Sequence, residues 1–182
     1  MRIHLDIVLV LAGVAPLLAQ QTPVNRTVFV VVTDQMKRAV TGLPRESFGV
    51  TEDGALRPVT AFSDANSPIS LAFVAQSIPG EVAELKRPGD EMFQAQSVAD
   101  ALRALAGSKN SRKALIFTAG TIVGEIPSGV QLLKTGSQNL RKSVIEVMNS
   151  YSFRFSSSVP ASAVEVNLRP PAGLPPLTVT TW

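Results

Sequence analysis

Two short runs of apolar residues, separated by an amphipathic segment, constrain the fold of this chain more than any other feature. Residues 69–74 (ISLAFV) and 114–118 (ALIFT) are each as long as a strand and almost continuously apolar, which is typical of strands buried on both faces. Residues 97–106 lie between them with apolar side chains at helical spacing, and Ser97 and Asp100 resemble a capping box. A strand, helix, strand order predicts a right-handed crossover onto a parallel sheet. We therefore expect an α/β fold, with α+β as the alternative.

The first part of the chain has the pattern of a small antiparallel β-unit. A β-branched run, VFVVVT, begins at Val28, and residues 47–52 alternate apolar and polar side chains. Asp53-Gly54 follows directly, and this dipeptide is the strongest short signal for a two-residue hairpin. A return strand is expected over residues 56–62, where a proline favours an edge position.

The rest of the chain predicts a second helix and further strands. Residues 137–150 carry an apolar stripe at helical spacing, and residues 151–155 alternate as a strand does. Residues 121–136 contain a proline and several glycines and are ambiguous. The chain is expected to divide into a signal peptide (1–19), an N-terminal β-hairpin unit (24–63), and a shortened α/β region with a C-terminal β-hairpin (64–182).

The first nineteen residues have the features of a secretory signal peptide. Arg2 supplies the positive start, residues 7–14 supply an apolar core, and Ala19 is a small residue at the cleavage position. We expect cleavage near Ala19 and a secreted or periplasmic protein. The alternative is an uncleaved segment, which would be the protein's only link to a membrane.

Cysteine and histidine usage narrows the chemistry open to this chain. It has no cysteine, and its one histidine, His4, lies in the predicted signal peptide. The mature chain would therefore lack Ser-His-Asp and Cys-His catalysis, as well as metal sites built from imidazole or thiolate. Oxygen-ligated ions such as Mg²⁺ or Ca²⁺ remain open. The formal net charge of +3 is a mild excess that does not indicate nucleic acid as a partner.

The segment that begins at Val28 resembles the N-terminal signature of von Willebrand factor A (VWFA)-related proteins of acidobacterial type. In that family a strand ending in Thr-Asp leads to V-T-G-L, then to F-x-V-x-E-D-G and a closing Phe. The matching residues here are Thr33, Asp34, Val40, Thr41, Gly42, Leu43, Phe48, Val50, Glu52, Asp53, Gly54 and Phe62. The later blocks ISLAFVAQS, LKRPGDEMF, VADALRALAG, RKALIFTAG and LRKSVIEVMNSYSFRF follow the family's order. The resemblance covers most of residues 24–182 and implies a compressed A-domain-like sheet with flanking helices. Internal blocks of the family are missing near Phe93 and between Gly120 and Gln138.

The same resemblance implies where a site would lie. A-type domains bind ligands through a divalent cation, held by Asp-x-Ser-x-Ser after the first central strand and by the aspartate of F-T-D-G. The matching positions here are Ala75, Ser77 and Pro79, and Ala119 replaces the second aspartate. Mg²⁺ needs carboxylate and hydroxyl oxygens in near-octahedral array, and both carboxylates are replaced by alanine. We predict a degenerate former metal site, with no metal and no cofactor.

Other charged clusters are weaker candidates. Two adjacent acid pairs are Glu52-Asp53 and Asp90-Glu91, and the basic clusters are Lys109, Arg112 and Lys113 in a loop and Arg141-Lys142 on a helix. The acid pairs fit a Ca²⁺ or acid/base site or ordinary turn chemistry, and we favour the turns. For the basic clusters we favour a solvated surface over phosphate contact.

These patterns favour binding over catalysis. The function expected is that of an exported, non-enzymatic protein-interaction module with no catalytic residues. Its partner would be an extracytoplasmic protein that the sequence does not identify. One alternative is a degenerate envelope subunit that is stable only in a larger assembly. The other is a hydrolase that uses carboxylates alone, through Asp53 or Asp90.

Overall fold

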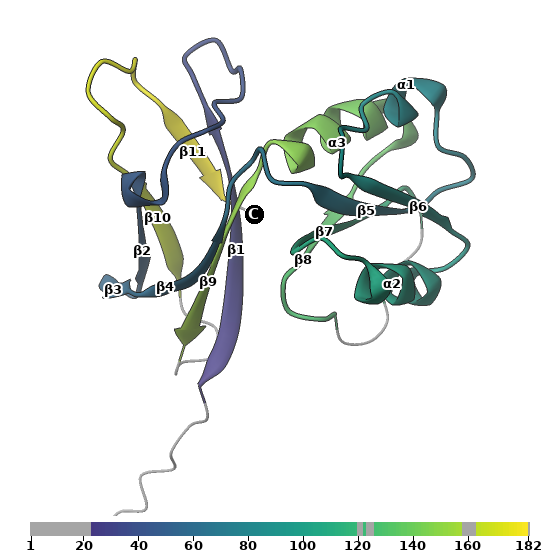
Figure 1. Ribbon diagram of the computed structural model, residues 1–182, viewed down its shortest axis with the longest axis horizontal. Coiled ribbons are helices and arrows are strands. Elements are labelled where there is room, and N and C mark those ends of the chain that lie inside the picture. The colour runs from purple at the N-terminus through teal and green to yellow at the C-terminus, as the bar shows by residue number, and fades with distance from the viewer. Residues whose placement is uncertain (1–22, 120–121, 123–125, 158–162, 182) are drawn as a thin grey trace, which may run out of the picture.

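The computed structural model describes residues 23–119, 122, 126–157 and 163–181, so the predicted signal peptide lies outside the described residues. The chain forms two lobes side by side (Figure 1). Two short segments, residues 64–68 and 149–150, join the lobes, and we call them the first and second crossings. The β lobe comprises residues 23–63, 151–157 and 163–181, and the α/β lobe comprises residues 69–119, 122 and 126–148. The mixed α/β fold class predicted from the sequence is confirmed.

Two antiparallel sheets build the β lobe. The four-stranded sheet has the order β11-β1-β9-β4, and the three-stranded sheet has the order β10-β2-β3. Their strands are β1 (Val24–Thr33), β2 (Phe48–Glu52), β3 (Ala55–Arg57), β4 (Val59–Ser63), β9 (Tyr151–Ser157), β10 (Val164–Leu168) and β11 (Thr178–Thr181), with a 3₁₀ turn, η1 (Arg45–Ser47), before β2. Alternate residues of β1 and β9 turn inward and pack with Phe48 and Val50 of β2, which closes a core between the two sheets.

The predicted hairpin turn is confirmed, but its return strand is divided. Asp53 and Gly54 both have positive φ, and Glu52 pairs with Ala55 across the two-residue turn. Pro58 then separates β3 from β4, and these strands lie in different sheets. The single return strand predicted over residues 56–62 is therefore wrong. A proline donates no ladder hydrogen bond, so it marks the place where the chain leaves one sheet for the other.

A parallel sheet forms the centre of the α/β lobe. Its strand order is β6-β5-β7-β8, and every neighbouring pair is parallel. Its elements are β5 (Ile69–Val74), α1 (Gly80–Ala83), β6 (Glu91–Ala95), α2 (Val98–Gly107), β7 (Arg112–Phe117), β8 (Val130–Lys134), the 3₁₀ turn η2 (Ser137–Asn139) and α3 (Leu140–Met148). The two central strands and both long helices follow the sequence pattern. The edge strands β6 and β8 were missed, because each is short and neither shows clear alternation.

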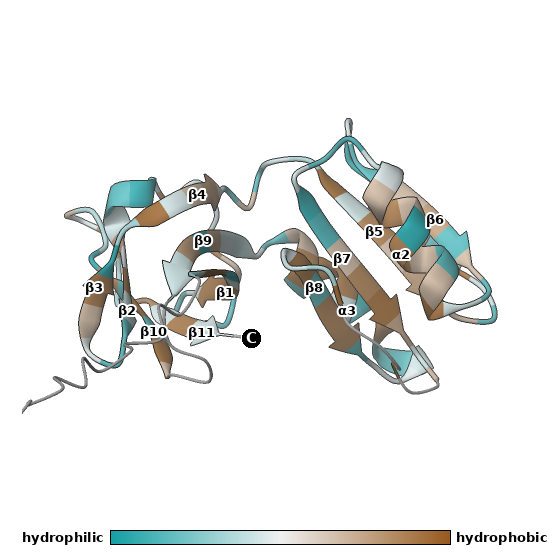
Figure 2. Ribbon diagram, turned by 90° about the horizontal axis from the view of Figure 1, so that it is seen from below, coloured by the Kyte–Doolittle hydropathy of each residue, from teal (hydrophilic) through white to brown (hydrophobic). Residues whose placement is uncertain are grey.

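Helices cover both faces of the parallel sheet. Side chains of Ile69, Leu71 and Phe73 pack against α1 and α3, whereas Ala72 faces α2 on the other side. Figure 1 shows α3 and α2 on opposite sides of the sheet, and Figure 2 shows that β5, β8 and the second half of β7 are largely apolar. Within the described ranges, no helix is long and apolar enough to span a bilayer.

The α/β lobe is an insertion between two neighbouring strands of the β lobe. The chain leaves the β lobe after β4 and returns at β9, and Ser63 pairs with Ser152 in adjacent antiparallel strands. Residues 24–63 therefore share their sheets with strands from the end of the chain. β10 pairs with β2 and β11 pairs with β1, so the predicted C-terminal hairpin is wrong.

Candidate functional site

The four positions that the resemblance would assign to a metal motif lie at the carboxyl ends of β5 and β7. These strands are neighbours, with Val74 opposite Phe117, and the Thr118 amide donates to the Val74 carbonyl at 3.2 Å. The chain continues from β5 to β6 on one side, while β7 lies on the other, so this edge is the topological switch point where open α/β sheets bind ligands. The fold thus brings Ala75, Ser77 and Pro79 to the same edge of the sheet as Ala119.

That edge presents few groups able to ligate an ion. Ser77 and Ala119 are exposed, Ala75 is half-buried, and the side-chain amide of Gln94 donates to the Gln76 carbonyl at 3.2 Å. Methyl groups at positions 75 and 119 offer no oxygen to Mg²⁺. Among the residues that the structure describes, no three His, Cys, Asp or Glu side chains gather where they could hold a metal ion.

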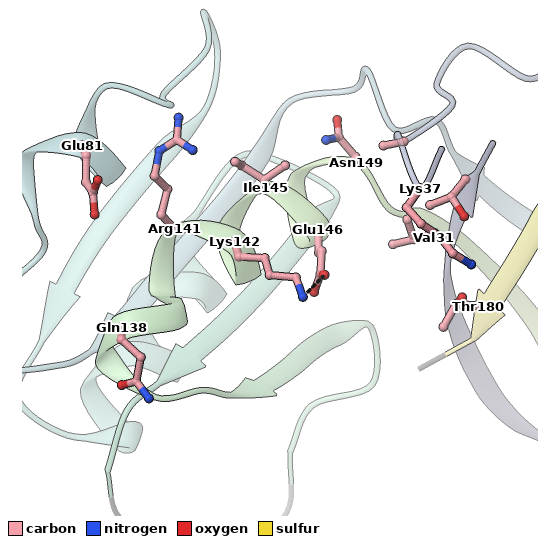
Figure 3. A pocket seen from close by; sticks show the side chains of 12 residues that line it. Val31, Lys37, Glu81, Gln138, Arg141, Lys142, Ile145, Glu146, Asn149 and Thr180 are labelled. Carbon is pink, nitrogen blue, oxygen red and sulfur yellow. Dashed lines mark ion pairs between the residues drawn. The ribbon is translucent and has the colours of Figure 1, made fainter. Parts of the chain in front are cut away.

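A larger hollow lies between the two lobes, and we call it the interlobe groove (Figure 3). It has a volume of about 680 Å³, within the usual range of ligand pockets. Its residues are Val31, Thr33, Lys37, Ala39 and Thr180 of the β lobe, Glu81 of α1, and Gln138, Arg141, Lys142, Ile145, Glu146 and Asn149 of α3 and its flanks.

One face of α3 lines the groove along its length. Leu140, Val144 and Val147 are buried against the parallel sheet, so the opposite face is left to the groove. The sequence predicted that Arg141 and Lys142 lie on a helix, as a solvated basic cluster. It gave no sign that β1 and β11 stand across from them, because that placement depends on how the lobes join.

Positive charge reaches the groove from both lobes. Lys37 projects from the β lobe, and Arg141 and Lys142 project from α3 (Figure 3). The carboxylates of the groove are Glu81 and Glu146, and Glu146 lies 3.9 Å from the Lys142 ammonium. Apolar side chains of Val31, Ala39 and Ile145 line the same hollow.

Hydrogen bonds to the carboxylate of Asp34 stabilise the turn that carries Lys37. The amides of Met36 and Arg38 each donate to Asp34 Oδ1 at 2.9 Å, and the Arg38 guanidinium lies 2.7 Å from Oδ2. Lys37 has a φ of 62°, in the left-handed region that a side chain seldom adopts. Hydrogen bonds from Arg38 hold the pKa of Asp34 below its ordinary value of 3.8.

The Asp34 contacts should therefore weaken in acid. The depressed pKa means that the carboxylate stabilises the folded turn above pH 3.8, and that this contribution disappears as the pH falls through the lower folded value. In an NMR titration we expect the amide signals of Met36 and Arg38 to shift together with a midpoint below 3.8. Asp34→Asn, which cannot titrate, should abolish the shift; a midpoint above 3.8 would contradict the assignment.

Arg112 holds the two crossings between the lobes. Although it was predicted to lie in a solvated basic loop, it begins β7 and is only 2% exposed. Its Nη1 donates to the carbonyls of Ala65 and Ser67 at 2.9 and 2.6 Å, and these residues belong to the first crossing. Its Nη2 donates to the carbonyls of Val147, Met148 and Ser150, at 3.1, 3.0 and 2.8 Å, where α3 ends and the second crossing begins.

This guanidinium stays charged while buried. Loss of solvent lowers the pKa of Arg112 to about 10, which still leaves it protonated at neutral pH. A positive charge at the C-terminus of α3 also matches the helix dipole. Lys113, the next residue, makes similar contacts at another helix: its ammonium donates to the carbonyls of Leu105 and Ser108 at the end of α2. Arg112 and Lys113 thus bind the carbonyl groups at the C-terminal ends of α3 and α2, which lie on opposite faces of the sheet.

The acid pairs also have structural roles. Asp90 is buried; its carboxylate accepts from the Ile69 amide at 2.9 Å and from Arg87, whose guanidinium also donates to the Ala65 carbonyl. Glu52 is buried between Arg26 and Arg57 in the β lobe. Asp53 and Glu91, the remaining members, lie in the hairpin turn and at the start of β6. These acids are therefore not gathered at one site.

The chain matches no family model, no curated protein and no solved structure.

Proposed function

We propose that this protein is an exported, non-enzymatic protein-interaction module, related to VWFA domains whose metal-dependent adhesion site has been lost, and that its partner docks in the interlobe groove. The observation that carries the proposal is the groove itself, which is lined from both lobes and combines apolar and charged side chains. Binding sites occur preferentially at such junctions between structural units.

The way the lobes are joined supports a binding groove whose shape is fixed before a partner binds. Both crossings are tied to one buried guanidinium, so the walls of the groove approach each other at a defined spacing. A preorganised site loses less conformational entropy when a partner binds.

The switch point supports the loss of metal-dependent adhesion. Ala75 and Ala119 follow adjacent parallel strands, which is where the resemblance would put the carboxylates of an adhesion site. Binding would then depend on the groove and would not require a divalent cation.

Site-specific photo-cross-linking tests this function. Ile145 in the groove is replaced by p-benzoylphenylalanine, and Ala99, exposed on α2, is replaced in a matched control. Irradiation in an extract of the source cells should join a defined protein to the Ile145 variant, while the Ala99 variant gives little product. The yield should be equal in Mg²⁺ and in a chelator.

Two outcomes would contradict the proposal. Equal products from both variants would mean that the groove has no special part in binding. A yield that requires Mg²⁺ would mean that a metal site is retained.

A further inference from the structure

We propose that the interlobe groove binds an extended acidic peptide segment of the partner, with carboxylates towards its two ends and an aliphatic side chain between them. This inference rests on the proposed function and specifies the chemistry of the docked segment.

The charges of the groove leave cations unmatched. Among the described residues, Lys37 and Arg141 form no ion pair, whereas Lys142 is 3.9 Å from Glu146. Glu81 is the other carboxylate of the groove and also forms no ion pair among the described residues. Two unpaired cations therefore face one unpaired carboxylate, so the groove has an excess of positive charge that favours a negatively charged ligand.

The two unpaired cations come from different lobes and lie at separate ends of the hollow. Figure 3 shows Arg141 near Glu81, with Lys37 beyond Glu146 at the far side. The Asp34 hydrogen bonds hold the turn that carries Lys37 in its left-handed conformation, which sets the direction in which this side chain leaves the backbone. A ligand with charge at a single point would not meet both cations.

The space between these cations suits an aliphatic side chain. Ile145 is half-buried on the face of α3, and Val31 and Ala39 line the groove from the β lobe. Covering such surface removes apolar area from water, which favours binding. The Lys142–Glu146 ion pair lies beside Ile145 between the two unpaired cations (Figure 3), so the middle of the groove combines apolar and charged side chains.

The length of the groove fits a short peptide. Its α3 face runs from Gln138 to Asn149, or roughly 16 Å at a helical rise of 1.5 Å per residue. An extended peptide advances about 3.3 Å per residue, so about five residues would span the groove. A segment of that length can place a carboxylate at each end and an aliphatic residue at its centre.

The test measures fluorescence anisotropy of two labelled pentapeptides with the full chain. One is acetyl-glutamate-valine-leucine-valine-glutamate-amide, and the other has lysine in place of both glutamates. We expect the acidic peptide to bind at least tenfold more tightly and to weaken as salt rises, because salt screens exposed charges.

Variants locate the binding site. Arg141→Glu and Lys37→Glu should each weaken the acidic peptide at least tenfold, whereas Arg103→Glu removes an exposed cation on α2 and should change the affinity less than twofold. These side chains are on the surface, and the urea midpoint of each variant checks that the fold is retained.

Three outcomes would overturn the inference: equal binding of the two peptides, an effect of Arg103→Glu equal to that of Arg141→Glu, or equally strong competition by inorganic phosphate or oligothymidylate. These outcomes are separable from a failure of the proposed function. If the Ile145 cross-linker captures a partner while the acidic peptide does not bind, only the ligand chemistry is wrong.

Discussion

Arg112→Met is expected to lower the free energy of unfolding by about 3 kcal/mol, because five carbonyl oxygens each lose one donor. The Ala65 and Ser67 carbonyls keep Arg87 as a donor and the Val147 carbonyl keeps Ser150, so the loss falls mainly on the carbonyls of Met148 and Ser150. Each buried acceptor left without a partner costs about 1–3 kcal/mol, although water can reach some of them after the change. For a chain of this size, each kcal/mol corresponds to about 2–4 °C in Tm, so we expect a fall of roughly 6–12 °C. Urea unfolding and calorimetry measure the change.

The controls separate the loss of these bonds from the loss of charge. Arg112→Lys keeps the charge, but an ammonium has only three donors, so an intermediate loss is expected. Arg103→Met removes an exposed guanidinium that pairs with Asp100, and such pairs contribute about 0–1 kcal/mol. If Arg112→Met unfolds within 1 kcal/mol of the parent, the guanidinium does not hold the crossings.

Arg112→Met should also change how the lobes unfold. In the parent the guanidinium ties β7 and the end of α3 to both crossings. Without it the lobes are joined more loosely, and calorimetry should show a broader transition or two transitions. Small-angle scattering should show a larger radius of gyration. An unchanged radius and a single sharp transition would mean that other contacts set the lobe spacing.

Glu52→Gln is expected to lower the free energy of unfolding by about 3 kcal/mol, at the low end of the range for breaking a buried ion pair. Glu52 is fully buried and lies 3.4 Å from the Arg26 guanidinium and 3.0 Å from that of Arg57, and its carboxylate accepts from the Ser157 hydroxyl at 2.6 Å. The neutral amide leaves two cations facing each other. Because both arginine side chains are about one-quarter exposed, water compensates in part.

A neighbouring acid provides the control for Glu52. Glu165 lies on β10, paired with β2, and is exposed. Glu165→Gln should change the free energy of unfolding by no more than about 0.5 kcal/mol. Urea denaturation of both variants gives the comparison. Equal effects would show that the burial of Glu52 between the two arginines does not contribute to the free energy of unfolding.

Local patterns allowed much of the fold to be predicted. The apolar runs identified β5 and β7, the spacing of Val98 to Leu105 identified α2, and the Ser97 side chain accepts from the Asp100 amide as the capping pattern predicts. Such signals are recognisable because they depend on neighbours along the chain. β6 and β8 lacked them, since a five-residue edge strand is stabilised mainly by the strand beside it.

Only one part of the candidate site, the sheet edge, could be predicted from the sequence. The resemblance pointed to Ala75, Ser77, Pro79 and Ala119, and the fold places these positions at one sheet edge. The interlobe groove was missed, because its two walls come from segments whose contact no local pattern signals. Arg112 was also misread: a basic residue after a polar loop has the pattern of a surface residue, and only the carbonyl groups around it explain its burial.

The sequence by itself determined the nature of the segments: strands where β-branched or apolar residues run together, and a hairpin at Asp53-Gly54. The tertiary structure decided which segments meet. It paired the first strand with the strand that follows the insertion, and it placed α3 opposite β1 and β11. The physical reason is that pairing between distant strands and burial of a guanidinium are stabilised by the sum of many contacts from remote parts of the chain, and no short stretch of sequence contains that sum.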